Sequence, residues 1–311
     1  MTVNTARAVR LDRYGGLDEL YVDDIPLSEP GTGEVVVAVR AAGINYGETK
    51  IRSGEMHDMF PATFPSGQGS DLAGVVVAVG PGVSGIAEGD EVLGWSWRRS
   101  SHATHVVVPA DQLIPRPPQL SWEVAGSLYT VGSTAYAAVR AVDPQPGETV
   151  AVSAAAGGVG SFVVQLLVHR GVRVLGIASA SNSDWLRAHG AIPVPYGDGL
   201  RERLLAAAGP DGVHGFIDLF GPEYLDLAVG LGVAPDRIET ITAFQRAGEI
   251  GAKTDGVMQA TTPEILTEMA KLVASGAIEV PVAATYPLER VREAFAELER
   301  QHTRGKIVLI P

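Results

Sequence analysis

Cysteine is absent from this chain of 311 residues. Without cysteine the chain can form neither a disulfide nor a metal site that uses a thiolate ligand. This composition is compatible with a reducing compartment, and we expect a cytoplasmic protein.

An excess of basic residues and long apolar runs are also missing. Lys and Arg number 24 against 36 Asp and Glu, a formal net charge of −12. This balance argues against nucleic acid or an anionic membrane as a partner, because both call for a basic face. No apolar run reaches membrane-spanning length, and the opening residues, MTVNTARAVRLDRYGG, lack the apolar core of a signal peptide.

Hydrophobic residues make up 46% of the chain, and 37 Gly and 20 Pro accompany them. This content is enough for the cores of two domains, or of one large domain. Up to about residue 115, short strand-like segments alternate with Gly-rich turns and predict a barrel-like β domain. The segments cover residues 6–11, 34–42, 72–80, 90–94 and 103–109.

A proline-dense stretch at 114–118 predicts a boundary, and the pattern then changes to alternating helices and strands. Helical spacing covers 122–143 and returns at 263–274. The C-terminal part predicts a strand at 279–284, a helix at 288–300 and a final strand at 306–310.

The most informative stretch is 150–171, which reads VAVSAAAGGVGSFVVQLLVHRG. A strand, a glycine turn, a helix and the next strand at 172–178 form a βαβ unit of the dinucleotide-binding type. Ala155 takes the first glycine position of the fingerprint, while Gly157 and Gly160 take the second and third. The phosphates of a ligand would lie at the N-terminus of the helix, beside Gly158 and Val159. The alternative is a purely structural turn between a strand and a helix.

Four motifs in order resemble the medium-chain dehydrogenase/reductase superfamily, and more narrowly its zinc-free quinone oxidoreductase branch. They are AGINYGETKIRSG at 42–54, GSDLAGVVVAVGPGVSGIAEGDEVLG at 69–94, AGGVG at 156–160 and TRGKIVLIP at 303–311. The resemblance implies an α/β fold, with a GroES-like β-barrel domain from 1–120 and 276–311. An inserted Rossmann domain with a doubly wound parallel sheet would cover 121–275. It also implies an active-site cleft between the domains, and a homodimer.

Zinc-dependent members of this superfamily carry a Cys and a Gly-His-Glu segment, and this chain departs from both. Asn45 stands at the Cys position, and Gly69, Ser70 and Asp71 match the second motif. Asn and Ser are poor zinc ligands, so we expect a zinc-free protein in which Asp71 stabilises a turn. The only local histidine pair, His102 and His105, would be two partly exposed strand residues that face opposite sides.

The end of the second strand indicates which nicotinamide coenzyme is used. Ser179, Ala180, Ser181 and Asn182 follow that strand, and the first carboxylate is Asp184. Hydroxyl groups tolerate a 2′-phosphate that a carboxylate would repel, so we predict NADPH. In the family a Lys and a Tyr also hold this phosphate, and here Ser181 and Tyr196 stand at those positions. Arg187, Arg304 and Lys306 are candidate cations, or else solvated surface charges.

The resemblance places the segment GINYGETKIRSG beside the nicotinamide. Asn45 is then a candidate to bind coenzyme or substrate, and Tyr46 to donate to a carbonyl oxygen. A family tyrosine four residues further on is Lys50 here. The predicted coenzyme-binding residues are Asn45, Thr130, Gly157, Gly158, Val159, Gly160, Ser179, Ser181, Tyr196 and Arg304.

Other residues in these segments carry two interpretations. Thr130 and Thr134 match the region near the nicotinamide ring, or cap and pack their helix. Trp95, Trp97, Arg98 and Arg99 would dock a lipophilic substrate, or pack on the surface.

These features favour an NADPH-dependent reductase of a quinone or of an activated C=C bond in an enone or alkenal. Hydride transfer to such an electrophile needs hydrogen-bond donors near its oxygen and no strong general acid. Two alternatives remain open. One is an enoyl reductase of an acyl-chain pathway, and the other is a non-catalytic NADPH-binding protein.

Overall fold

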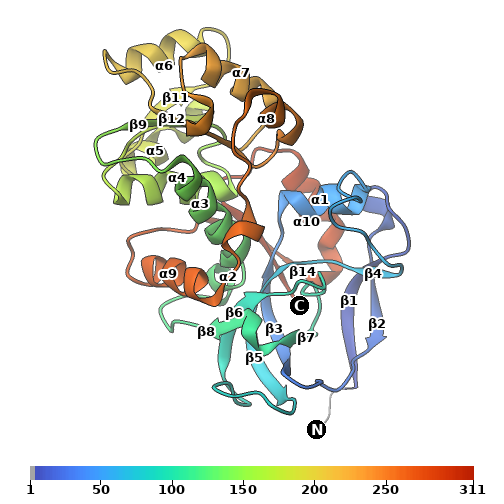
Figure 1. Cartoon of the computed structure of the whole chain (residues 1–311). Coiled ribbons are helices and arrows are strands. Elements are labelled where there is room, and N and C mark those ends of the chain that lie inside the picture. The colour runs from blue at the N-terminus through green and yellow to red at the C-terminus, as the bar shows by residue number, and fades with distance from the viewer. Residues whose placement is uncertain (1–3) are drawn as a thin grey trace. The chain divides into compact units, whose positions relative to one another are not determined.

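The computed structural model describes residues 4–311, which divide into two compact units (Figure 1). Unit 1 contains the residues up to Thr130 together with Thr262–Ala274 and Pro281–Pro311. Unit 2 contains Val131–Thr261 and Ser275–Val280. The functional division at residues 120 and 275 stays a prediction, because compactness does not test which residues serve coenzyme or substrate.

Unit 1 is built mainly from β-strands. They are β1 (Thr5–Leu11), β2 (Tyr21–Pro26), β3 (Glu34–Gly43), β4 (Ser66–Gly67), β5 (Asp71–Val79), β6 (Glu91–Trp95), β7 (His105–Pro109), β8 (Leu113–Pro115), β14 (Val282–Pro287) and β15 (Lys306–Ile310). One sheet has the order β2-β1-β4, and a larger one has the order β14-β15-β3-β5-β6-β8 with β7 also paired to β3.

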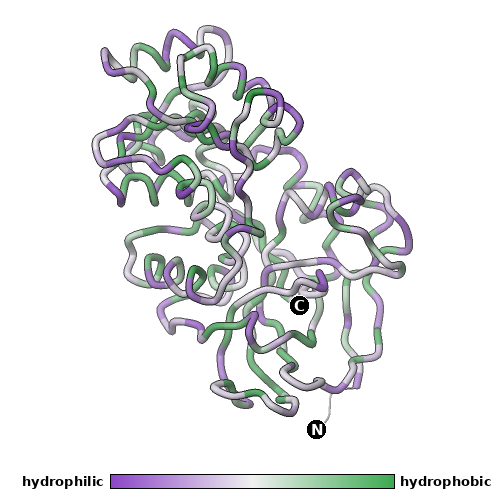
Figure 2. Tube along the Cα trace, viewed as in Figure 1, coloured by the Kyte–Doolittle hydropathy of each residue, from purple (hydrophilic) through white to green (hydrophobic). Residues whose placement is uncertain are grey.

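The valine-rich strands of unit 1 form its core because branched side chains pack well on a pleated surface. Val35, Val37 and Val39 alternate along β3 and pack with Val76 of β5 and Val106 of β7. The helices of this unit are α1 (Tyr46–Ser53), α2 (Trp122–Ala125), α9 (Pro263–Ala274) and α10 (Val291–Glu299). Hydrophobic and hydrophilic stretches alternate along the chain of this unit (Figure 2).

Unit 2 contains a five-stranded parallel sheet in the order β11-β10-β9-β12-β13. The strands are β9 (Thr149–Val152), β10 (Arg173–Ala178), β11 (Ile192–Pro195), β12 (Gly215–Asp218) and β13 (Ile238–Thr240). The chain passes from β9 to β10 and β11 on one side, and then to β12 and β13 on the other. In such doubly wound sheets ligands bind at the carboxyl ends of the strands where the order reverses.

Helices connect these strands, and helix α3 (Leu128–Val142) leads into the unit. The others are α4 (Gly158–His169), α5 (Ser183–Ala188), α6 (Leu200–Ala208), α7 (Pro222–Gly230) and α8 (Phe244–Ile250). Single 3₁₀ turns occur in the two units at Leu17–Glu19, Ala110–Gln112, Ala180–Asn182, Pro235–Arg237, Val257–Ala260 and Leu288–Arg290. The predicted class, a β-rich part with a doubly wound parallel sheet, is confirmed. No helix within residues 4–311 is long and apolar enough to cross a membrane.

The single helix predicted at 122–143 is wrong, because the structure breaks it into α2 and α3 around Gly126. The Gly126 backbone approaches β3 so closely that a Cβ there would lie 2.3 Å from the Ala41 carbonyl oxygen. Its own carbonyl accepts a hydrogen bond from the Gly43 N–H at 2.7 Å. Because Gly126 contacts the sheet in this way, the helix does not continue through it. The predicted helix at 288–300 likewise begins as a 3₁₀ turn before α10.

Candidate functional site

The glycine turn of unit 2 connects β9 to α4. Gly157 is the N-cap residue and the helix begins at Gly158. A Cβ on Gly160 would lie 2.1 Å from the Ala154 carbonyl oxygen, so only glycine lets the helix pack against the turn. Gly157 has extended backbone, and a Cβ there would meet only the Ala154 oxygen at 3.3 Å. Packing within the chain therefore requires glycine at 160 more than at 157, which is consistent with a ligand that approaches the backbone at 157.

The first turn of α4 suits an anion. Its N–H groups have no partner within the helix, and the helix dipole adds positive potential there. No acidic residue stands in this first turn. A pyrophosphate therefore fits this end of the helix on both hydrogen-bonding and charge grounds.

A group of neutral polar side chains follows β10. The Ser179 hydroxyl lies 2.9 Å from that of Ser181 and accepts a hydrogen bond from Asn182 Nδ2 at 2.9 Å. The nearest acid along the chain, Asp184, is fully exposed and forms a 2.8 Å ion pair with Arg187. The strand end thus offers hydroxyl and amide groups, and Arg187 is already paired.

Tyr196 comes directly after β11, the strand that pairs with β10, and the residue is about half exposed. Its backbone N–H donates to the Ala178 carbonyl at 3.2 Å, which ties it to the end of β10. The Arg203 guanidinium holds the same turn by donating to the carbonyl groups of Pro195, Gly197 and Asp198.

Asp218, a residue that sequence reasoning missed, connects three loops at this edge. Its fully buried carboxylate accepts hydrogen bonds from Ser153 Oγ at 2.7 Å, from Thr240 Oγ1 at 2.7 Å and from the Phe220 and Gly221 N–H groups. Ser153 begins the glycine turn, and Thr240 ends β13. An acid that ends a buried strand, as in GFID, was the available signal.

Unit 1 contains a buried cluster formed by Asn45, Glu48, Asp71 and Lys306. The Lys306 ammonium donates to Asn45 Oδ1 and to the Ile44 carbonyl, and it lies 3.6 Å from Asp71 Oδ2. Asn45 Nδ2 donates to Asp71 at 3.3 Å and faces Glu48 Oε1 at 3.5 Å. Both ends of the Asn45 amide are therefore engaged inside the cluster.

The structure excludes one of the two interpretations of Lys306 and contradicts the prediction for Asp71. Lys306 is no surface charge, because it is only 3% exposed. Asp71 does not stabilise a turn: it begins β5, and its Oδ1 accepts from both the N–H and the hydroxyl of Thr130. Charge pairing in the interior explains both positions, since a buried ammonium requires a partner.

Burial sets the proton affinities in and beside the cluster. Loss of hydration, with the nearby Asp71 charge, raises the pKa of Glu48 to about 7. Burial lowers the pKa of His102 to about 4, so His102 is neutral at physiological pH. Its Nε2 faces the Gly43 carbonyl oxygen at 3.3 Å. Burial also lowers the pKa of Lys306, although Asp71 and Glu48 act in the opposite direction.

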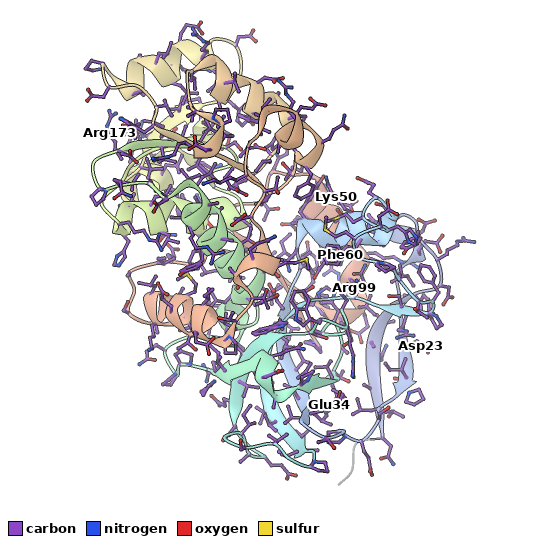
Figure 3. The ribbon with its side chains drawn as sticks, viewed as in Figure 1. Asp23, Glu34, Lys50, Phe60, Arg99 and Arg173 are labelled. Atoms are coloured by element: carbon purple, nitrogen blue, oxygen red, sulfur yellow. The ribbon has the colours of Figure 1, made fainter. Side chains whose placement is uncertain are left out.

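Tyr46 is the exposed member of the predicted catalytic pair, with 40% of its surface accessible. Its hydroxyl accepts a hydrogen bond from Gln301 Nε2 at 2.7 Å, so its own hydrogen is available to another acceptor. Lys50 lies one turn further along α1 (Figure 3). Arg304 is exposed, and Thr134 is buried within α3.

The structure corrects two further predictions, one about Trp95 and one about the pair of histidines. Trp95 is not part of a docking loop, because it ends β6, is 3% exposed and stacks on Tyr129 at 4.9 Å. Trp97 is exposed. His102 lies before β7 and is fully buried, so the expected pair of partly exposed strand histidines is wrong.

The arginines after Trp97 have partners in unit 1. Arg98 forms a 2.8 Å ion pair with Glu34. Arg99 donates to the Pro61 carbonyl at 2.9 Å. Both Glu34 and Arg99 can be located in Figure 3.

The donor set of unit 1 does not fit a metal. Within residues 4–311 no group of three or more His, Cys, Asp or Glu side chains is arranged to hold an ion. At the candidate position the Asn45 oxygen already accepts from Lys306, whose positive charge would repel a divalent cation.

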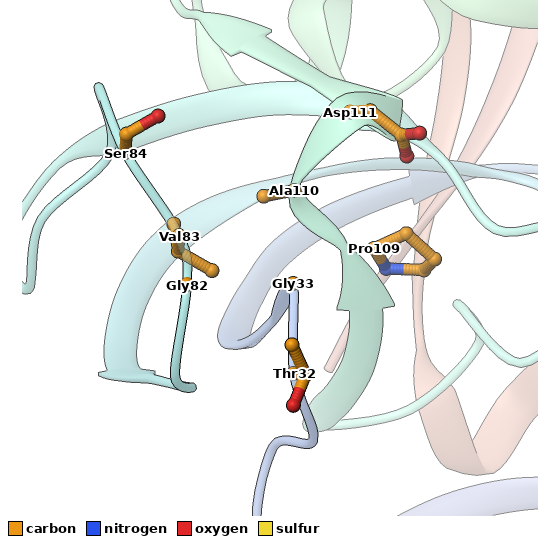
Figure 4. Close-up of a pocket in the computed structure, with 8 residues that line it drawn as sticks. All are labelled: Thr32, Gly33, Gly82, Val83, Ser84, Pro109, Ala110 and Asp111. Carbon is orange, nitrogen blue, oxygen red and sulfur yellow. The ribbon is translucent and has the colours of Figure 1, made fainter.

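Two surface hollows of unit 1 contain none of the predicted site residues. One, of about 480 Å³, lies between the turn before β3, the loop after β5 and the end of β7 (Figure 4). Asp111 is its only ionisable lining residue. The other, of about 290 Å³, lies beside Leu20 and Arg292. Neither offers the chemistry of the glycine turn or of the buried cluster.

Comparison with known proteins places these features in a family context. Residues 31–118 match the alcohol dehydrogenase GroES-like domain, and residues 194–309 match a family described as zinc-binding dehydrogenase. Quinone oxidoreductase 1 of Escherichia coli is 30% identical over 98% of this chain and 100% of its own length. The solved structure of an E. coli quinone oxidoreductase complexed with NADPH is 28% identical, with a TM-score of 0.87 over 98% of this chain and 100% of that one.

The chain also matches pieces of much larger proteins. It is 29% identical to mycoketide-CoA synthase of Mycobacterium tuberculosis over 96% of its length, but spans only 8% of that synthase. It likewise spans 8% of a pikromycin polyketide synthase component of Streptomyces venezuelae, at 31% identity.

Proposed function

Because this chain belongs to the medium-chain dehydrogenase/reductase superfamily, in its quinone oxidoreductase-like branch, we propose that it is an NADPH-dependent reductase of quinones or activated C=C bonds. The observation that carries the proposal is the carboxyl edge of the unit 2 sheet. There a glycine turn opens onto the N-terminus of α4, and neutral hydroxyl groups follow β10.

Residues of this edge would hold the coenzyme. The N–H groups of Gly158, Val159 and Gly160 are proposed to bind the pyrophosphate, and Gly157 to leave room for it. Ser179, Ser181 and Tyr196 are proposed to contact the 2′-phosphate. When bound, the reduced nicotinamide supplies the hydride that, with one proton, converts a quinone to a quinol or an enone to a saturated carbonyl.

Tyr46 is proposed to stabilise the substrate oxygen. Its hydroxyl hydrogen is free while Gln301 donates to its oxygen, so the phenol can donate to an oxygen that gains negative charge. Water or the same phenol can then deliver the proton, because a phenolate or enolate needs no strong acid. Asn45 and Thr130 are still proposed to lie beside the nicotinamide. The buried cluster would orient their side chains. Arg304 is proposed as an exposed cation for the coenzyme phosphates.

We propose that this chemistry proceeds without zinc. A zinc ion binds atoms with free electron pairs. At the position of Asn45 the amide oxygen already accepts a hydrogen bond from the Lys306 ammonium. A homodimer is also proposed, on the family resemblance, and sedimentation equilibrium tests the oligomeric state. A cytoplasmic location is proposed on the cysteine-free composition.

A second candidate is the reduction of an enoyl thioester in an acyl-chain pathway. The matches to mycoketide-CoA synthase and to a pikromycin polyketide synthase component favour it, since this chain resembles a part of each and a CoA product is a thioester. The two candidates differ in the electrophile, because an enoyl thioester carries a long pantetheine arm and a quinone does not.

A substrate panel separates these candidates. NADPH oxidation is followed at saturating coenzyme with 1,4-naphthoquinone, an alkyl enone and crotonyl-CoA. We expect turnover of the quinone or enone, with kcat/KM above that for crotonyl-CoA. The reverse order supports the enoyl reductase. Tight NADPH binding without turnover of any of the three supports the non-catalytic alternative.

A further inference from the structure

The cation at the centre of the buried cluster belongs to the chain itself. Lys306 is 3% exposed, and its Nζ reaches the Ile44 carbonyl at 2.9 Å, Asn45 Oδ1, and Asp71 Oδ2 at 3.6 Å. A buried ammonium is stable only when oxygen atoms replace its water. These three oxygens come from the end of β3, the start of α1 and the start of β5, so one cation joins three elements of unit 1.

The same cation fixes the side chains around it. With Lys306 on its oxygen and Asp71 and Glu48 facing its nitrogen, the Asn45 amide has one orientation that satisfies all of its neighbours. Asp71 transmits the effect further, because its other oxygen accepts from the Thr130 N–H at 2.9 Å and from the Thr130 hydroxyl. The Thr130 hydroxyl hydrogen is therefore committed to Asp71, and only its oxygen electron pairs face elsewhere.

Charge balance shows why the lysine is needed. Glu48 and Asp71 are two buried carboxyl groups, and Lys306 is the cation that contacts one of them and attracts both. His102, the other ionisable group beside Glu48 at 3.9 Å, is neutral. A neutral side chain at 306 would leave two acids without a counter-ion in the interior. It would also leave the Asn45 oxygen without its donor.

We infer that Lys306 is a positioning residue of the proposed reductase, whose ammonium orients Asn45 directly and Thr130 through Asp71. This inference rests on the proposed function, because it concerns turnover beside those two residues. Lys306 is buried, so it acts only through its neighbours.

Substitution of Lys306 by Met tests the inference against Lys306→Arg and against Lys271→Met, an exposed lysine of α9 in the same unit. At saturating NADPH and quinone, we expect kcat of Lys306→Met to fall by about tenfold to hundredfold, the usual effect of a misplaced active-site group. Lys306→Arg should recover part of that loss, and Lys271→Met should match the wild type. The Kd for NADPH should change far less than kcat, because most proposed coenzyme contacts lie in unit 2. Thermal melts of all variants verify folding.

A double-mutant cycle with Asn45→Ala identifies the route. If Lys306 acts through Asn45, the double variant loses much less than the product of the two single losses, because both remove the same arrangement. Losses in kcat that simply multiply would overturn the route through Asn45.

Hydrogen exchange tests the positioning without a substrate. In Lys306→Met the backbone amides of 45–49 and of Thr130 should exchange faster, since the Asn45 and Thr130 N–H groups bond to Glu48 and Asp71. Lys271→Met should leave them unchanged. Unchanged exchange, or an unchanged kcat, overturns the inference. A wild-type protein that turns over no quinone or enone instead overturns the proposed function, and the exchange experiment then still decides whether Lys306 orders this site.

Discussion

The hydroxyl of Tyr46 has its oxygen occupied by Gln301 and its hydrogen free. Tyr46→Phe removes that hydrogen without changing the ring. We expect kcat with a quinone to fall about tenfold, since a hydrogen bond to a developing charge contributes roughly 1.5 kcal/mol. The Kd for NADPH should stay unchanged in a fluorescence titration. Tyr21→Phe, which removes a hydroxyl bound to Asp12 in the same unit, is the matched control. Equal kcat for Tyr46→Phe and wild type would exclude the proposed role.

We propose that Ser179 determines the coenzyme preference. Neutral donors to a charged phosphate contribute roughly 1.5–3 kcal/mol, which predicts about a tenfold to hundredfold preference for NADPH over NADH. The lower end is expected, because Ser181 stands where a charged donor would strengthen the contact. Ser179→Asp should reverse the preference, since a carboxylate repels the 2′-phosphate and binds the 2′-hydroxyl.

The ratio of kcat/KM for the two coenzymes measures this preference. Ala206→Asp places the same charge on an exposed position of α6 and should leave the ratio as it is. Equal use of both coenzymes by the wild type, or an unchanged ratio in Ser179→Asp, would contradict the assignment.

The role of a single residue could be predicted from the sequence where the local backbone geometry alone requires that residue type. Gly160 follows from the fingerprint, and the 2.1 Å approach of a Cβ to Ala154 gives its physical reason. Lys306 and Asp71 were not predictable, because a charged residue in a strand reads as a surface residue until its partner is known. Their partners lie far apart in sequence, and only the tertiary fold brings them together.

At the scale of elements, the βαβ unit around α4 is the part that the sequence predicted best. Its strands are short apolar runs, and its helix begins at the glycines. The helix at 122–143 was mispredicted because its apolar spacing continues through Gly126, where contact with β3 breaks it. Strand β2 was missed since its pattern, YVDDIP, is polar and half exposed at the sheet edge.

A charged substitution in the first turn of α4 tests the proposed phosphate site. Gly158→Asp places a carboxylate among N–H groups that we propose to hold the pyrophosphate, so NADPH binding should be lost while the fold persists. Gly230→Asp at the end of α7 is the control, because a Cβ there would meet no atom within 4 Å. Fluorescence titration measures affinity, and circular dichroism verifies the fold. Undiminished affinity in Gly158→Asp would mean that the phosphates bind elsewhere.

At the scale of the whole molecule, buried acids make stability depend on pH. Glu239 on β13 is fully buried, and neither carboxylate oxygen has a hydrogen-bond partner among the described residues. Burial raises its pKa to about 8, and the nearby Asp255 charge adds to this effect while Lys253 opposes it. A raised pKa means that the folded state binds the proton more tightly. The stability from this group is therefore complete below its ordinary pKa of 4.5 and is lost as the pH rises through about 8.

Glu239→Gln removes this titration. Between pH 6 and pH 9 we expect the Tm of the wild type to fall further than the Tm of Glu239→Gln. The additional loss should correspond to about 1–3 kcal/mol of unfolding free energy. Glu48, whose pKa is about 7, leaves a smaller slope of the same sign in the variant. Glu202→Gln, on the exposed side of α6, should behave like the wild type. An equal fall of Tm with pH in the wild type and in Glu239→Gln would show that Glu239 does not titrate in this range.

One turnover measurement decides whether the chain is a reductase that uses NADPH and no metal. The purified chain is dialysed against a strong chelator, its metal content is determined, and NADPH oxidation with 1,4-naphthoquinone is followed, with Gly158→Asp as the blank. We expect less than stoichiometric zinc, full activity after chelation and no enzymatic rate in the variant. About one zinc per chain, with activity that disappears on its removal and returns when it is restored, would contradict this expectation.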